Sequence, residues 1–243
     1  MAAETSVGIA VAMSACMRTL PFLLALLLPA AALAGPAEKR WLSKDFSFRL
    51  AGMQVLPHDA VNSALQASLR AWTEVGAGPL VALEPGEGRA EARLDGVNSI
   101  FFVTQDWPSR PEELALTYTH VDASTREILE VDIAINAAHH VFATESDPRA
   151  FDLQNVLTHE LGHALGLPHN HEDPEATMYP HIRAGEQAKR DLALSDERAL
   201  LALYEGVSLE GPAHGCSSVH SVDPSWLLAL LPTLFLRRRV RRQ

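Results

Sequence analysis

The chain has 243 residues, of which 47% are apolar and 21% are charged, and its formal net charge is −10. This composition supports one domain with a substantial core, or two small ones, and it excludes a disordered chain. The chain has only two cysteines, Cys16 and Cys216, which are too few for a disulfide scaffold. It contains no uninterrupted apolar stretch of about 20 residues, and this excludes a polytopic membrane protein. The acidic balance argues against nucleic acid as the main partner.

The N-terminal segment has the three parts of a secretory signal peptide. Arg18 precedes an apolar run over residues 20–28, and a small-residue stretch ends in Ala32-Leu33-Ala34. Two prolines disfavour the alternative, a buried N-terminal helix. Residues 1–16 are either a long n-region or the product of an over-called start codon. We therefore expect residues 1–34 to be a signal peptide and the protein to be exported.

The following segment, residues 35–210, predicts a single α+β domain. Residues 41–50 alternate apolar and polar side chains and predict a strand, and residues 57–75 have apolar side chains at helical spacing. Four strand-like runs follow, at residues 80–83, 99–104, 115–121 and 128–135, and a short turn joins the last two into a hairpin.

Two further helices are predicted in the second half of this domain. Asp152 is a favourable N-cap for a helix over residues 153–165. A last helix is expected to start behind Ser195, to run from Asp196 to Tyr204, and to end at Gly206.

The chemistry-bearing motif is H-E-L-G-H-A-L-G-L-P-H, residues 159–169. His159 and His163 lie four residues apart, so both imidazoles project from one helical face and can bind one ion. Gly166 can end the helix and turn the chain so that His169 becomes a third nitrogen ligand. Three histidines leave the fourth position of Zn²⁺ open for water, which is typical of a catalytic site, and Glu160 is placed to act on that water. His171 competes with His169 for the third position, but the spacing from Gly166 favours His169.

This motif, followed by a turn containing Met178, resembles the signature of metzincin zinc endopeptidases. Its Met-Tyr-Pro form is similar to the matrixin (matrix-metalloprotease-like) branch. The resemblance implies a metzincin-like catalytic domain: a twisted, mostly parallel sheet of about five strands with three helices, and zinc in the cleft below the sheet. It also implies that Met178 forms a floor under the imidazoles. The peptide bond would be hydrolysed by a zinc-activated water, with Glu160 as general base.

The resemblance also indicates where a peptide or protein substrate would bind. An extended peptide would pair with an exposed edge strand, for which residues 115–121 are our candidate. Pro180, His181 and Ile182 occupy the place of the family's substrate pocket wall. A catalytically inactive, zinc-containing surface binding module is the alternative, and zinc content together with peptide hydrolysis separates the two.

Other family features have no counterpart in the sequence. Residues 35–40 contain no Pro-Arg-Cys-Gly segment, so we expect no latency through a cysteine ligand. The His-Gly-Asp loop for a structural zinc is absent, so one catalytic zinc is expected. Carboxylates such as Glu145, Asp147, Asp152 and those of residues 172–175 could bind Ca²⁺, but carboxylates on an acidic surface are usually solvated.

The C-terminal segment, residues 211–243, has the composition of a sorting signal. Gly215-Cys216 precedes an apolar run over residues 226–236, which is too short to span a bilayer comfortably, and an arginine cluster ends the chain. This arrangement resembles the C-terminal sorting signals of myxobacterial surface proteins, which implies removal of the tail and anchoring through Cys216. A plain membrane tail and a packed helix are the alternatives. We expect the protein to be extracellular or anchored at the cell surface, and to be a monomer. Residues 35–236 contain 14 Lys and Arg and 29 Asp and Glu, so this segment has a net charge of −15.

Overall fold

The computed structural model describes residues 38–52 and 55–210. The expected signal peptide and the C-terminal segment with Cys216 therefore lie outside the described residues. Within the described part, no helix combines the length and the apolar character that crossing a bilayer requires.

A five-stranded sheet forms the centre of the domain, with strand order β2-β1-β3-β5-β4. The strands are β1 (Asp45–Ala51), β2 (Leu80–Leu83), β3 (Asn98–Val103), β4 (Ala115–Val121) and β5 (Ile128–Asn136). Neighbouring strands are parallel except β4 and β5, which form the predicted antiparallel hairpin. The helices are α1 (His58–Thr73), α2 (Leu153–Ala164) and α3 (Leu194–Tyr204). The predicted mostly parallel sheet with three α-helices is confirmed.

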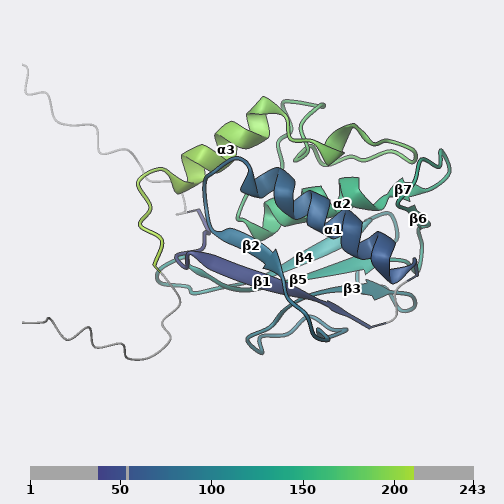
Figure 1. The fold of residues 1–243 in the computed structure, drawn as a ribbon, viewed down its shortest axis with the longest axis horizontal. Coiled ribbons are helices and arrows are strands. Elements are labelled where there is room, and N and C mark those ends of the chain that lie inside the picture. Colours follow the sequence, from purple (N-terminus) through teal and green to yellow (C-terminus); the bar gives the residue numbers. More distant parts are fainter. Residues whose placement is uncertain (1–37, 53–54, 211–243) are drawn as a thin grey trace, which may run out of the picture. The chain divides into compact units, whose positions relative to one another are not determined.

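The main core lies between the sheet and the helices α1 and α2, which run side by side over one face of the sheet (Figure 1). Val131, Ile133 and Ile135 of β5 are fully buried on that face, as the two-residue period of a strand requires. Trp72 of α1 donates from Nε1 to the carbonyl oxygen of Thr158 at 2.7 Å. This contact ties α1 to the turn of α2 that carries the motif.

Two elements start at least two residues away from their predicted first residue, and α1 ends two residues before its predicted end. The first strand begins at Asp45, because the buried ring of Trp41 instead stacks on Phe46 and donates from Nε1 to the carbonyl oxygen of Ala164 at 2.8 Å. The last helix begins at Leu194, ahead of Ser195, because the carboxylate of Asp196 accepts the backbone N–H of Ala193 at 3.0 Å. The start of α2 is as predicted, with Asp152 accepting the N–H of Asn155.

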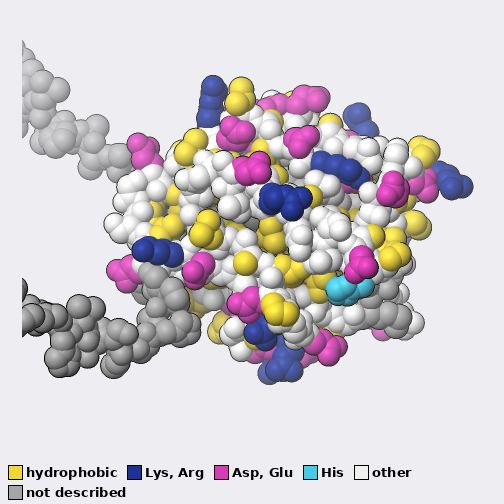
Figure 2. All heavy atoms as spheres, in the orientation of Figure 1, with side chains coloured by type: hydrophobic (Ala, Val, Ile, Leu, Met, Phe, Trp, Pro, Cys, Tyr) yellow, Lys and Arg dark blue, Asp and Glu magenta, His cyan; other side chains and the backbone are white. Residues whose placement is uncertain are grey.

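Three short elements were not predicted, since two or three residues carry no periodic signal. They are the strands β6 (Phe142–Ala143) and β7 (Phe151–Asp152), which pair with each other, and the 3₁₀ turn η1 (Ala188–Arg190). On the face shown in Figure 2, acidic, basic and apolar side chains are interspersed over the described residues.

Candidate metal centre

Helix α2 and the turn after it bring three histidines together. His159 and His163 lie on one face of α2, which ends at Ala164. Gly166 follows with φ +104°, and a β-carbon there would collide with the carbonyl oxygen of Lys39, so only glycine fits. The chain then reverses, and His169 returns to the face of the helix.

The Nε2 atoms of the three imidazoles converge on one point. The Nε2 of His169 lies 3.2 Å from that of His159 and 3.1 Å from that of His163. A tetrahedral zinc with Zn–N bonds of 2.0–2.1 Å holds its nitrogen ligands about 3.3 Å apart. The three donors therefore fit a zinc ion, and the ring of His171, 5.9 Å from the ring of His169, is not part of the group.

Backbone carbonyls hold the ligands in the protonation state that a metal needs. The Nδ1 atoms of His159 and His163 lie 2.7 Å and 2.8 Å from the carbonyl oxygens of Thr177 and Leu167. A proton on each Nδ1 donates to that carbonyl, so the Nε2 lone pair faces the convergence point. Burial lowers the pKa of both imidazoles to about 4, which keeps them neutral. Burial and the nearby His171 also lower the pKa of His169.

Glu160 lies beside the three imidazoles with only 7% of its surface exposed. Burial raises the pKa of its carboxyl, while the neighbouring imidazole of His163 and a hydrogen bond from Thr117 oppose that rise. The hydroxyl of Thr117, on β4, donates to Oε2 of Glu160 at 2.5 Å. The sequence contained no signal for Thr117 apart from its place in the predicted edge strand.

The turn of residues 176–180 packs under the histidines. Met178 is 2% exposed and lies against α2, and its carbonyl oxygen accepts the N–H of Asn170, next to His169. The buried carboxylate of Asp196 accepts the N–H groups of Thr177 at 2.7 Å and of Met178 at 3.1 Å. The sequence placed Asp196 only in the last helix, so its role as the anchor of this turn was missed.

The predicted pocket wall follows this turn. Pro180 and Ile182 are half-buried, and His181 is exposed. The carbonyl oxygen of His181 accepts a hydrogen bond from Nζ of Lys189 at 2.5 Å. Lys189, which the sequence did not single out, is 2% exposed, and its Nζ lies 5.0 Å from the ring centre of Tyr179. A buried ammonium thus supports the wall segment from behind.

Two of the carboxylates considered as Ca²⁺ ligands, Asp152 and Asp147, have partners of their own. The carboxylate of Asp152 accepts from Arg190 and from the N–H of Asn155, and Asp147 accepts from Arg149.

A second group of titratable side chains lies on the sheet face away from α1 and α2: His120, Glu130 and Asp132. Both carboxylates are 1% exposed. Glu130 accepts the N–H groups of Asp95 and Gly96, and Asp132 accepts those of Arg93 and Ser99. Backbone N–H groups already donate to the carboxylate oxygens of Glu130 and Asp132. These two carboxylates therefore hold the loop before β3 in place.

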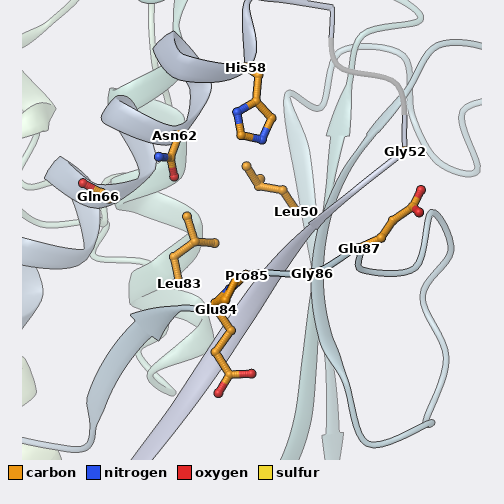
Figure 3. A pocket seen from close by; sticks show the side chains of 10 residues that line it. All are labelled: Leu50, Gly52, His58, Asn62, Gln66, Leu83, Glu84, Pro85, Gly86 and Glu87. Carbon is orange, nitrogen blue, oxygen red and sulfur yellow. The ribbon is translucent and has the colours of Figure 1, made fainter.

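A pocket of about 620 Å³ lies near the β2 edge of the sheet, at the opposite end of the strand order from β4. It lies between α1 and the ends of β1 and β2 (Figure 3). His58, Asn62 and Gln66 line it from α1, and the carboxylates of Glu84 and Glu87 point away from the other labelled side chains. None of the zinc-ligand candidates contributes to it.

The chain is similar to several known proteins. The chain is 27% identical to rat stromelysin-1 over 184 residues, which are 73% of this chain and 35% of the relative. It is 30% identical to human matrix metalloproteinase-19 over 169 residues, 68% of this chain and 30% of the relative. The chain thus matches about a third of the length of these relatives. The matrixin family model matches residues 40–205, most of the chain, so the protein belongs to the matrixin family of zinc metallopeptidases.

Proposed function

We propose that the protein is a zinc-dependent endopeptidase. The observation that carries this proposal is the convergence of three imidazole Nε2 atoms beside the buried carboxylate of Glu160. His159, His163 and His169 would hold one Zn²⁺. Zinc, when bound, supplies a Lewis acid that acidifies water and polarises a carbonyl group.

Glu160 is the proton carrier in this proposal. Its carboxylate accepts a proton from the attacking water as the new C–O bond forms at the scissile carbonyl. The same proton passes to the leaving amine when the C–N bond breaks, so Glu160 ends the cycle ionised. Because Glu160 is nearly enclosed, bulk water does not compete for this proton.

The substrate in this proposal is a peptide or protein segment in extended conformation. Strand β4 is the last strand of the sheet order and pairs only with β5 among the described strands, so its other edge presents unpaired backbone groups. Thr117 of β4 contacts Glu160, the residue after His159, and this contact supports β4 as the substrate-binding edge. Pro180, His181 and Ile182 would form the wall of the pocket for a substrate side chain.

We also propose, from the sequence alone, that the protein acts as a monomer outside the cell. Residues 1–34 would be removed as a signal peptide, residues 35–210 would form the protease domain, and residues 211–243 would direct anchoring through Cys216. Mass spectrometry of the mature protein tests this proposal, because it reports both termini and any group attached to Cys216.

The decisive experiment compares wild type with Glu160→Gln in zinc content and in hydrolysis of a quenched peptide library. We expect equal zinc content and a loss of hydrolysis of at least about 100-fold in the variant, because the amide cannot accept the proton. Glu172→Gln, an exposed carboxylate in the following loop, is the matched control and should behave as wild type. A wild type that binds zinc but cleaves no peptide would instead support the inactive binding module.

A further inference from the structure

We propose that Thr117 is a positioning residue that fixes the carboxylate of Glu160 in its working orientation. The inference rests on the proposed function, in which Glu160 carries the proton. Thr117 and Glu160 lie 43 residues apart in the chain, and the fold brings the hydroxyl and the carboxylate oxygen to 2.5 Å.

The position of Thr117 in the sheet explains why its side chain reaches the helix. Thr117 is the third of the seven residues of β4 and is paired with Ile133 of β5, whose side chain is fully buried in the core under the helices. Residues directly opposite in an antiparallel pair project to the same face of the sheet. The Thr117 hydroxyl therefore points toward α2 and not toward the opposite face.

The hydrogen bond constrains a torsion that is otherwise soft. Rotation about the last bond of a glutamate side chain has broad preferences, so packing alone leaves the carboxylate plane poorly defined. The hydroxyl donates to Oε2 at 2.5 Å, which is in the range of a charge-assisted O–H···O⁻ bond, whereas the Glu160 carbonyl oxygen is 3.4 Å away. With Oε2 held in this way, Oε1 is the oxygen left to take the proton from water.

This geometry links the strand proposed to bind substrate with the group that moves the proton. A displacement of β4 would move the Thr117 hydroxyl and with it the Glu160 carboxylate. Preorganised donors of this kind lower the barrier because no reorientation is needed during the reaction, and a misplacement of about 1 Å can cost about 100-fold in rate.

The test compares Thr117→Val, which keeps the shape but removes the donor, with Thr117→Ser, which keeps the donor. We expect Thr117→Val to lower kcat about 10- to 100-fold with KM within about 2-fold, and Thr117→Ser to restore most of kcat. Thr73→Val is the matched control, since Thr73 is a half-buried threonine on α1 whose hydroxyl donates to Leu69, away from the site. It should leave kcat unchanged.

A structural readout separates this inference from the proposed function. Crystal structures should show the Glu160 carboxylate turned or in several rotamers in Thr117→Val, and as in wild type in Thr117→Ser. If wild type cleaves no peptide, the proposed function fails, while these structures still decide whether Thr117 orients Glu160. Unchanged kcat in Thr117→Val, or an unmoved Glu160 carboxylate, would overturn the inference. Thr117→Ala, which also lacks the donor, replaces the valine variant if that protein does not fold.

Discussion

The side chain of Met178 fills the space that a β-carbon on Gly162 would need. Gly162 lies on α2 directly before His163, and the ring of Trp72 approaches the same point, with Cζ2 at 2.8 Å from the β-carbon position. The glycine of the H-E-L-G-H motif is therefore a packing requirement. It lets the turn with Met178 lie directly against the helix that carries two of the histidines.

We predict that Gly162→Ala destabilises the domain by about 1–3 kcal/mol, because an extra carbon in a filled core forces its neighbours to move. Zinc affinity should fall as well, since Thr177, beside Met178, holds the ring of His159 through its carbonyl oxygen. Urea unfolding and zinc titration measure the two effects.

The double variant Gly162→Ala/Met178→Ala is the control for this prediction. Removing the Met178 side chain makes room for the new carbon. The loss of unfolding free energy in the double variant should therefore be smaller than the sum of the losses in Gly162→Ala and Met178→Ala. The ring of Trp72 stays in place, so the rescue should be partial. Strictly additive effects would mean that Met178 is not what excludes a side chain at position 162.

The second prediction concerns the third zinc ligand. His169→Ala should weaken zinc binding by more than about 100-fold, which exceeds the usual effect of losing a group outside the ligand set. His171→Ala should change it by no more than about 3-fold, since its ring lies beyond the convergence point. Competition against a chromophoric chelator measures both affinities. The reverse order of effects would assign the ligand role to His171.

The third prediction is a pH dependence of stability caused by Asp132. Burial, and then the charges of Glu130 and Asp95, raise the pKa of this carboxyl from 3.8 to about 6. The backbone N–H groups that donate to it lower the pKa and offset only part of this rise. A carboxyl whose pKa is higher in the folded state favours folding while it is protonated. Its contribution is complete below about pH 4 and is lost as the pH rises through 6.

Urea unfolding of wild type and Asp132→Asn between pH 4 and pH 8 tests this sign. The free energy of unfolding of wild type minus that of the variant should fall as the pH rises to about 6.5 and stay level above it. Asp122→Asn is the control, because hydrogen bonds from Ser124 and Thr125 lower the pKa of Asp122 to about 2. Its difference from wild type should be level over this range. A level difference for Asp132→Asn as well would contradict the raised pKa.

The sequence by itself determined the features that depend on residues near one another in the chain. The four-residue spacing of His159 and His163 places both on one helical face, and Asp152 caps the start of that helix. The turn at Gly166 needs a positive φ that glycine adopts easily, so the return of His169 was predictable. The β4–β5 hairpin was also predictable, because a short turn joins two strands that are neighbours in the chain.

Only the tertiary structure decided which distant residues complete the site. Thr117 reaches Glu160 because β5 inserts between β3 and β4, a strand order that local periodicity does not specify. Asp196 binds the Met178 turn from a helix that begins 16 residues after Met178, and Lys189 supports His181 from within the core. Hydrophobic periodicity sets which face of an element is buried, but the partner that covers each polar group depends on how the elements pack.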